Sequence, residues 1–373
     1  MKKIAIIISI FLIALVIFSL LKFMNFYRAI YTPTISTTPT PEKNSFNILI
    51  LGYGGGKHDG AYLTDTMILF HVDTKKKKAT LVSLPRDMWV KLPSKSGDDI
   101  HMKINTIYEI ELFPNDFPDI SANHFGTKDD ANFAKYIISQ VTGQTIDGYV
   151  GIDFQAFQKA IDIIGGVDVD VEKTFTDEEY PIDGHEADLC GKTEKDLPDL
   201  LKIATDSPTL AFPCRYEKIT FQKGLNHMNG ETALKYVRSR HSLQDGGDFG
   251  RAARQQRLIE AVRNKVLSVD FITKVPSLID EMQKYIKTDI SGDLFKKFLG
   301  EITSASLYKI DRFVLSDTNY LQDAFSAGGQ FILIPIAGAD KWKDVQIGIK
   351  NEIEGITPTP SPLATPSGTI KTK

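Results

Sequence analysis

The sequence predicts an α/β protein, and two observations carry this prediction. First, strand-like and helix-like hydrophobic patterns alternate along most of the 373-residue chain. Second, residues 148–171 predict a strand–helix–strand unit. A strand is expected over Gly148–Ile152, followed by a helix that begins at Asp153 and ends at Gly165-Gly166. A returning strand is expected over Val167–Val171. A unit of this kind implies that at least some strands pair in parallel.

The strands before this unit predict antiparallel pairing as well. Asn47–Gly52 has the short apolar run of a buried strand. Thr66–Val72 and Ala79–Leu84 follow as two more strands, and the polar segment between them, which ends in Lys75–Lys78, suits a solvated turn. We interpret the four lysines as a soluble loop tip, and contact with anionic lipid is the alternative.

Helices are expected at three further places. Residues 129–141 are amphipathic and stop at Gly143, and residues 230–237 and 251–269 have helical periodicity. Residues 172–218 are acidic and irregular, which is typical of an inserted loop or lid. The stretch 307–352 returns to an α/β pattern, with an apolar strand at 331–336.

Composition limits the class of protein. A hydrophobic content of 42% supports a large core, in one domain or in two. The formal net charge of −3 argues against a general nucleic-acid binder, so no nucleic acid is expected among the partners.

The N-terminal segment predicts an exported domain on a membrane anchor. Ile4–Leu21 is apolar apart from two serines and is long enough to span a bilayer. Lys2 and Lys3 precede it, so residues 1–3 are expected in the cytoplasm, residues 4–24 in the membrane and the domain outside the cytoplasm. A cleaved signal peptide is the alternative, but Lys22 and the aromatic residues after it make a poor cleavage site. Thr- and Pro-rich stretches predict a linker over 25–44 and a disordered tail over 353–373.

Both cysteines, Cys190 and Cys214, lie in the part that is expected to be exported. Disulfides persist in that environment, so we expect a bond between them. Two free or buried thiols are the alternative. Zinc is not expected, because no His or Cys lies at ligand spacing near either cysteine.

The most informative stretch is Tyr236–Gln256, YVRSRHSLQDGGDFGRAARQQ. Guanidinium groups stay charged and grip phosphate oxygens bidentately, and bringing several together is costly unless an anion lies between them. The chain as a whole is near neutral, so this basic cluster is a local feature. It predicts a phosphate-bearing substrate, with these candidate ligands: Arg238, Arg240, Arg251, Arg254 and Gln255.

The expected helix over 251–269 adds to this prediction. Arg251, Arg254 and Gln255 share one of its faces near its start, where free backbone N–H groups and the helix dipole attract an anion. Asp248 lies just before them and is expected to cap the helix or to act as a base.

Further candidates come from earlier segments. Arg86 and Asp87 follow a strand at a position that often faces the ligand crevice of an α/β sheet, an ordinary surface pair being the alternative. Asp65 begins a strand and is a candidate Mg²⁺ ligand against a pyrophosphate, or simply a turn residue. Lys103 and Asn105 are further donors. No side-chain arrangement predicts a nucleophile, which suits phosphoryl transfer by positioning and charge stabilisation.

Taken in order, these motifs resemble the LytR–CpsA–Psr family of bacterial cell-envelope proteins. The resemblance covers roughly residues 46–270 and rests on NILILG, LTDTMILFHVD, LVSLPRDMWV, KIN, YVGIDFQAF, IIGGVDVDV, LNHMNGETALKYVRSR and GDFGRAARQQ. It implies a three-layer α/β/α catalytic domain with a mixed central sheet over 45–270. Residues 172–218 would form an insertion in it, and 271–352 a C-terminal α/β extension.

The resemblance also implies an activity. Family members bind a polyprenyl-phosphate or polyprenyl-pyrophosphate lipid in a hydrophobic tunnel. They transfer its glycopolymer, such as teichoic acid or capsule, to peptidoglycan through a phosphodiester. We therefore expect a membrane-anchored, Mg²⁺-dependent phosphotransferase, whose partners are the lipid-linked glycopolymer, peptidoglycan and the membrane. By motif match, the pyrophosphate ligands would be Arg86, Arg238, Arg240, Arg251 and Gln255, the metal ligand Asp65, and the bases or arginine organisers Asp87 and Asp248.

One position departs from the family pattern. Gly54 stands where the family often has a second metal-binding Asp, and Asp59 is the candidate substitute. Two alternative functions stay open at this point. One is hydrolysis of the same lipid with water as acceptor, and the other is non-catalytic lipid binding by an envelope regulator.

Overall fold

The computed structural model describes residues 44–56, 60–126, 130–267, 285–302 and 304–356. Its centre is a six-stranded sheet in the order β11-β6-β1-β2-β3-β12. β1 pairs antiparallel with β2 and parallel with β6, so the sheet is mixed, as expected. The strands are β1 (Ser45–Tyr53), β2 (Thr64–Asp73), β3 (Lys78–Ser83), β6 (Gly148–Asp153), β11 (Lys287–Thr288) and β12 (Lys309–Val314).

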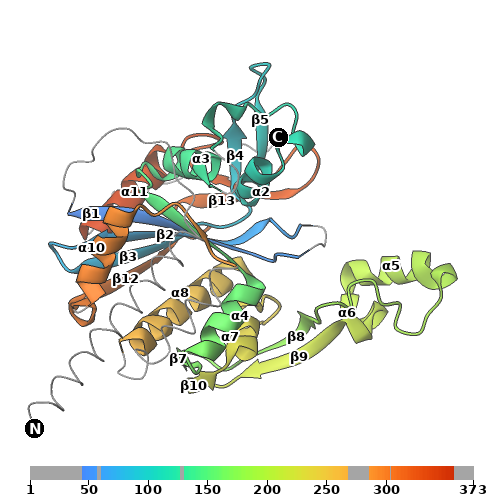
Figure 1. The fold of residues 1–373 in the computed structure, drawn as a ribbon. Helices are drawn as coiled ribbons and strands as arrows, with labels where there is room; N and C mark the ends of the chain where they lie inside the picture. The colour runs from blue at the N-terminus through green and yellow to red at the C-terminus, as the bar shows by residue number, and fades with distance from the viewer. Residues whose placement is uncertain (1–43, 57–59, 127–129, 268–284, 303, 357–373) are drawn as a thin grey trace, which may run out of the picture.

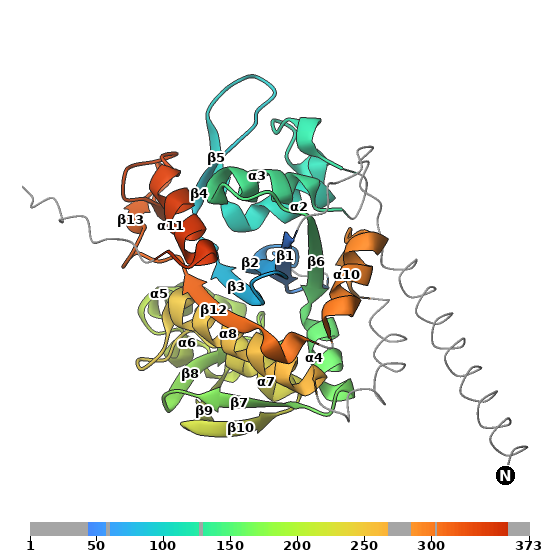
Figure 2. The same cartoon turned by 90° about the vertical axis from the view of Figure 1, so that its left-hand side faces the viewer.

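Helices cover both faces of the sheet (Figure 2). One face carries α2 (Ile107–Leu112), α3 (Asn132–Thr142) and α11 (Lys343–Glu354), and the other carries α4 (Phe154–Ile163), α7 (Gly230–Arg238) and α8 (Gly247–Val266). Side chains of β1 point alternately to the two faces of the sheet, so Leu49 and Leu51 belong to one hydrophobic cluster and Phe46 and Ile48 to another. The helix α10 (Gly292–Ile302) packs on the second cluster. These layers agree with the expected α/β/α arrangement.

The expected parallel strand–helix–strand unit is wrong in one respect. β6 and α4 form as predicted, and Asp153 caps α4 by accepting a hydrogen bond from Ala156 N at 2.7 Å. However, β7 (Val167–Val171) leaves the central sheet and pairs antiparallel with β10 (Gly224–Met228). The parallel partner of β6 is β1. The alternating burial of VDVDV explains this, because a strand with one solvated face suits an antiparallel ribbon.

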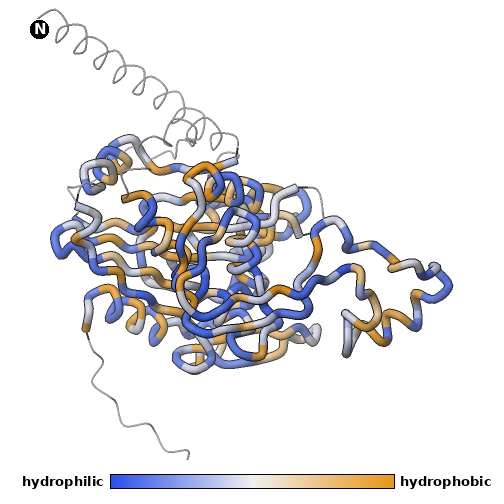
Figure 3. The backbone as a smooth tube through the Cα atoms, turned by 90° about the horizontal axis from the view of Figure 1, so that it is seen from below, coloured by the Kyte–Doolittle hydropathy of each residue, from blue (hydrophilic) through white to orange (hydrophobic). Residues whose placement is uncertain are grey.

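Residues 172–218 are more regular than expected. β8 (Phe175–Pro181) and β9 (Tyr216–Phe221) pair as a ribbon that projects from the body and ends in α5 (Leu197–Asp206) and α6 (Pro208–Ala211) (Figure 1). We call residues 175–221 the arm. Hydrophobic and hydrophilic segments alternate along it (Figure 3), and Leu201 and Leu210 near its tip are exposed.

The described part of the expected C-terminal extension, from residue 285, packs on the same body as the residues before 268. β11 and β12 form the two edges of the central sheet. A hairpin of β13 (Leu321–Phe325) and β14 (Phe331–Pro335) lies beside the hairpin of β4 (Trp89–Leu92) and β5 (Ile100–Lys103), with Leu333 N donating to Asp87 O at 2.8 Å.

Three expectations on the termini concern residues outside the described ranges. The predicted anchor at 4–24 and linker at 25–44 fall there almost entirely, as does the tail beyond residue 356. Within the described ranges, no helix combines the length and hydropathy needed to cross a membrane. The helix α11 extends to Glu354, so the first two residues assigned to the tail are helical.

Candidate active site

Most of the predicted site residues converge where the start of β2 meets the end of β3 in the central sheet. β2 and β3 are antiparallel, with Ile68 opposite Ser83, so the start of β2 and the loop after β3 lie side by side. This pairing brings Asp65 next to Arg86. The first turns of α8 reach the same place, because the buried amide of Gln256 donates to Ser83 Oγ at 2.8 Å and to Phe313 O at 3.0 Å.

Arg86 lies at the centre of the site. Its Nη1 donates to Asp65 Oδ1 at 2.7 Å, and its Nε lies 3.6 Å from an oxygen of Asp87 and 3.6 Å from one of Asp248. Burial would lower the pKa of Arg86, but the charges of Asp65 and Asp248 outweigh it and leave the pKa raised. This guanidinium therefore stays charged between three carboxylates.

Asp248 gathers the other arginines. Its Oδ1 lies 2.9 Å from Arg251 Nη2 and 3.1 Å from Arg240 Nε. Burial would raise the pKa of Asp248, but the charges of Arg251, Arg240 and Arg86, with a hydrogen bond to Asp87, outweigh it and lower the pKa. Arg251 is 5% exposed, and desolvation lowers its pKa to about 10 despite the facing carboxylates. Asp248 is thus a weak base that organises arginines.

Some donors of the cluster are unsatisfied. Arg86 Nε and Arg240 Nε are buried and have no hydrogen-bond partner, although both lie near carboxylate oxygens. Both groups lie in ion pairs with Asp248 that lack hydrogen-bond geometry. The side chains of Arg238, Arg240 and Arg251 line the inner cleft, where an acceptor from a ligand would complete the pairing of the cluster. A phosphate oxygen has the charge and the lone pairs to fill this role.

The turn that carries Arg240 is held by a residue that the sequence analysis missed. Asp177 is fully buried at the base of the arm, where its Oδ2 accepts hydrogen bonds from Ser239 Oγ at 2.7 Å and Arg240 N at 2.9 Å. Burial would raise its pKa, but these hydrogen bonds and others from Glu179 and His241 lower it. No local pattern in FTDEEYP distinguishes Asp177 from its acidic neighbours, because its partners are about 60 residues away.

Two clefts meet at this cluster. The first, which we call the inner cleft, has a volume of about 190 Å³. Arg238 lines it and is held by an ion pair with Asp183 at 3.0 Å and by the ring of Phe154, 4.4 Å from its guanidinium carbon. The inner cleft is also lined by Asp65, Arg240, His241, Arg251 and Gln255.

The second cleft, which we call the outer cleft, lies on the side of the β4–β5 hairpin and has a volume of about 700 Å³. Lys103 Nζ contacts Asp87 Oδ1 at 2.5 Å there, and Asn105 lies beside them. A third, small cavity of about 10 Å³ lies between them: it shares Arg86 with the outer cleft, and Asp65, Arg251 and Gln255 with the inner cleft. The outer cleft is lined by Arg86, Asp87, Trp89, His101, Lys103, Asn105 and Phe331, among others.

Arg254 does not join the phosphate ligands that the sequence predicted. Its side chain has no exposed surface, and its Nε donates to Tyr236 O at 2.9 Å. The remaining guanidinium nitrogens donate to Asp245 O and Ser239 O. Arg254 thus fixes the 236–245 segment that carries Arg238 and Arg240. One helical face can hold both an arginine that lines a cleft and an arginine with no exposed surface, which the spacing alone does not distinguish.

The start of α8 also differs from the prediction. The helix begins at Gly247, which has φ +71°, so Arg251 lies in its second turn and not at its start. Asp248 lies in the first turn, and the N-cap is Gly246, which has no side chain that could cap the helix. Asp248 is therefore not the N-cap that was one of its two expected roles, although its charge favours the helix N-terminus.

The structure describes one of the two candidate metal ligands, Asp65. Asp59 lies outside the described residues, and Asp65 is paired with Arg86. Among the described residues, the one group of three potential metal ligands is Asp188, Cys190 and Cys214, far from this cluster along the arm. Asp65 suits Mg²⁺ only as one carboxylate among phosphate oxygens and waters, which is an arrangement that Mg²⁺ commonly takes.

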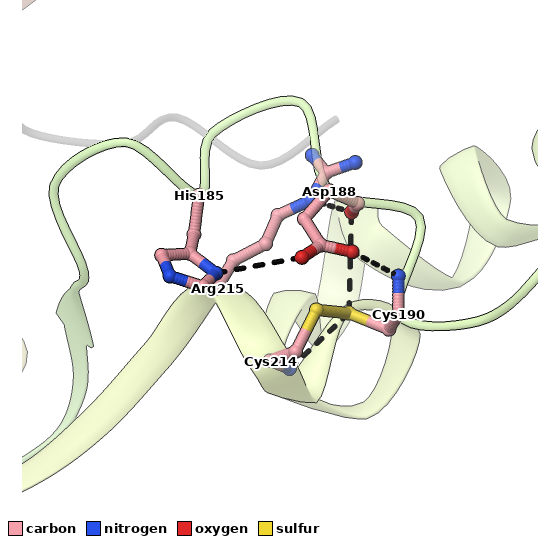
Figure 4. The surroundings of a disulfide bond; sticks show 5 residues. All are labelled: His185, Asp188, Cys190, Cys214 and Arg215. Carbon is pink, nitrogen blue, oxygen red and sulfur yellow. Dashed lines mark hydrogen bonds and ion pairs between the residues drawn. A yellow bond between two sulfur atoms is a disulfide. The ribbon is translucent and has the colours of Figure 1, made fainter.

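Cys190 and Cys214 form a disulfide in the arm, with 5.4 Å between their Cα atoms (Figure 4). Asp188 accepts a hydrogen bond from Cys190 N at 2.8 Å, and Arg215 Nε donates to Asp188 O at 2.7 Å. The sulfur atoms are thus bonded to each other and are not available as metal ligands. The bond ties the two ends of the helical tip of the arm.

The fold and this cluster define an α/β protein whose candidate site consists of paired arginines and carboxylates. The LytR_cpsA_psr family model matches residues 21–327, so the chain belongs to this family. It is 26% identical over 287 residues to polyisoprenyl-teichoic acid–peptidoglycan teichoic acid transferase TagU of Enterococcus faecalis, covering 76% of this chain and 74% of that protein. It is 28% identical over 254 residues to TagV of Bacillus subtilis, a transferase of the same description, covering 67% and 51%.

The crystal structure of B. subtilis TagV has the same fold. It superposes with a TM-score of 0.55 at 24% identity and covers 85% of this chain and 100% of that one. The match confirms the mixed α/β fold. This chain spans about half to three-quarters of the length of these two curated relatives.

Proposed function

We propose that this protein transfers a glycopolymer, with its linking phosphate, from a polyprenyl-pyrophosphate carrier to peptidoglycan. The observation that carries the proposal is the arginine cluster, in which Arg238, Arg240 and Arg251 line one cleft and suit pyrophosphate oxygens. The relatives' description as teichoic acid transferases that act on peptidoglycan supports the substrate class. The apolar Ile4–Leu21 segment supports a membrane anchor, with the catalytic body outside the cytoplasm.

The roles of the residues follow from their surroundings. Arg238, Arg240, Arg251 and Gln255 line the inner cleft, where they would bind the phosphate of the leaving polyprenyl group. Arg86 lies between the clefts and would hold the phosphate that is transferred. Asp65 would hold Mg²⁺ together with these phosphates, and the ion would neutralise developing charge.

Asp87 is the better candidate for the base. Three arginines surround Asp248 and lower its pKa, which weakens it as a proton acceptor. Asp87 lines the outer cleft and faces Lys103 and Arg86. The acceptor oxygen would form a bond to phosphorus as the bond to polyprenyl phosphate breaks. The proton of the acceptor hydroxyl would pass to Asp87, and the polyprenyl phosphate would leave with the bonding electron pair.

A reconstituted transfer reaction tests the proposal. The full-length protein in detergent is mixed with a synthetic polyprenyl-pyrophosphate glycopolymer and uncrosslinked peptidoglycan strands, and the covalent product is measured. Arg240→Ala removes charge-assisted hydrogen bonds, so we expect roughly ten- to hundred-fold slower transfer. Arg312→Ala is the matched control, because Arg312 forms a surface ion pair with Glu260 away from the clefts. Polymer released without acceptor attachment would favour the hydrolase, and binding without turnover would favour the regulator.

A further inference from the structure

The outer cleft differs in chemistry from the inner one. The rings of Trp89 and His101 lie nearly parallel, with 12° between their planes and 6.2 Å between their centroids. Phe331, which is 42% exposed, lines the same cleft from the other hairpin. Trp89 and His101 come from β4 and β5, so three different strands contribute aromatic side chains to the lining of one space of about 700 Å³.

The charged groups that line the outer cleft are held in ion pairs, and Arg86, which also lines it, pairs with Asp65. Lys103 is paired with Asp87, and His101 Nε2 lies 2.9 Å from an oxygen of Asp340. The inner cleft is smaller and is lined by three arginines together with Asp65 and Asp177. A cleft with aromatic side chains, amide and hydroxyl groups, and cations that are already paired suits a hydrogen-bonding ligand with flat apolar faces. Pyranose rings have these properties, because their axial C–H groups pack on aromatic faces while their hydroxyls hydrogen-bond at the edge.

The position of the cleft indicates which saccharide it binds. In phosphoryl transfer the attacking and leaving oxygens lie roughly in line on opposite sides of phosphorus. The inner cleft has the cations that a leaving polyprenyl phosphate needs. The outer cleft is lined by Arg86, which also lines the small cavity between the clefts. It is lined as well by Asp87, the carboxylate that would accept a hydroxyl proton.

We infer that the outer cleft is the acceptor subsite and that Trp89 and Phe331 bind the acceptor glycan by ring stacking. This inference rests on the proposed function, since it presumes a saccharide hydroxyl as the attacking group. It assigns the β13–β14 hairpin, which carries Phe331, a direct part in substrate recognition. It also explains why β14 lies against the loop of Asp87, where Leu333 N donates to Asp87 O.

Steady-state kinetics separate the acceptor from the donor. We expect Trp89→Leu and Phe331→Leu to raise the KM for uncrosslinked peptidoglycan strands by roughly ten-fold each, because each loses an aromatic contact, while the KM for the lipid donor stays within two-fold (about 0.4 kcal/mol). Trp89→Phe should recover most of the affinity. Leu225→Ala is the control, since Leu225 is on β10, is 75% exposed and lines neither cleft. A raised donor KM, or an unchanged acceptor KM in both variants, would overturn the inference.

A direct binding measurement keeps this result separate from the proposed function. The chain has two tryptophans, Trp89 and Trp342, so Trp342→Phe leaves Trp89 as the reporter. Titration of this variant with soluble peptidoglycan strands should quench its fluorescence saturably, and prior saturation with polyprenyl pyrophosphate should not abolish the change. If wild-type protein transfers no polymer but the quench is present, the proposed function fails and the glycan subsite stands. If transfer occurs without any quench, the subsite assignment is wrong.

Discussion

Arg86 and Asp65 form an ion pair of 2.7 Å across the junction of the two clefts, and Asp65 is the more exposed partner. The pair occupies two groups that the proposed reaction needs for other purposes, because Arg86 would bind phosphate and Asp65 would bind Mg²⁺. Substrate and metal therefore have to replace the pair together. This relationship predicts that metal dependence and phosphate binding are coupled.

The first prediction concerns that coupling. Asp65→Asn frees the guanidinium of Arg86, so polyprenyl-pyrophosphate binding in the absence of metal should be retained or strengthened. The stimulation of transfer by Mg²⁺ should be lost, and the rate at saturating Mg²⁺ should fall at least roughly ten-fold. Binding is measured by titration with and without a chelator, and transfer as a function of Mg²⁺ concentration. Asp323→Asn, at an exposed position, is the control, and normal Mg²⁺ stimulation in Asp65→Asn would refute the assignment.

The second prediction separates structural from ligand-binding arginines. Arg254→Met leaves three backbone carbonyls without their buried donor, so we expect the free energy of unfolding to fall by about 3 kcal/mol or more. Arg312→Met should change it by less than about 0.5 kcal/mol, because its ion pair is at the surface. Urea denaturation followed by circular dichroism measures both. Equal stability of the two variants would contradict the structural role of Arg254.

The third prediction is a pH dependence that Glu111 of α2 produces. Burial, together with Asp130, raises the pKa of Glu111 to about 8, against backbone hydrogen bonds from Gly126 and Phe133 that lower it. Between pH 4.5 and 8 the folded protein then holds a proton that the unfolded chain releases. The contribution of Glu111 to stability is therefore largest below pH 4.5 and declines as pH rises toward 8. Denaturation at several pH values measures the decline.

Two variants check this origin. Glu111→Gln cannot titrate, so its unfolding free energy should vary less over the same pH range, after a constant loss of roughly 1 kcal/mol from one backbone hydrogen bond. Glu178→Gln changes an exposed carboxylate on the arm and should leave the wild-type slope intact. A slope in Glu111→Gln as steep as that of wild type would assign the pH dependence to other groups.

The fourth prediction concerns the arm. The disulfide closes a loop with a sequence separation of 24, which the chain-entropy model equates with about 3 kcal/mol. Cys190→Ser with Cys214→Ser should accelerate backbone hydrogen exchange in residues 182–215, while the central sheet keeps its protection. Mass spectrometry of exchanged peptides resolves the two regions. Faster exchange throughout β1 and β2 in the double variant would show that the arm stabilises the body.

The sequence predicted the parts of the fold that local patterns determine. β1, β2, β3, β6 and α3 all lie within a few residues of their expected bounds, because apolar period and stop signals such as Gly143 act locally. The predicted parallel pairing of β7 within its strand–helix–strand unit was wrong, because the pairing of a strand depends on which distant strand offers a free edge. We predicted the arm as irregular because its sequence is acidic. The two strands of its ribbon have only a few buried residues each, so their hydrophobic pattern is weak.

The site was predictable in composition but not in geometry. Arg238, Arg240 and Arg251 line one cleft, as an arginine-rich motif indicates. Arg254 has the same chemistry and the same helical face, and only its contacts with carbonyl oxygens reveal its structural role. Asp177 gave no signal, since a carboxylate that fixes a distant turn has no motif of its own.

Both edge strands of the central sheet come from the end of the chain, which constrains how the protein reaches its native state. β11 covers β6 and β12 covers β3. A chain shortened to residue 270 would leave β3 and β6 as open edges, which pair readily with other chains and aggregate. The site loops after β3 would also lose the neighbour that fixes them. Assembly of the catalytic centre must therefore wait for almost the whole polypeptide, so early folding intermediates should lack activity even though they contain every arginine.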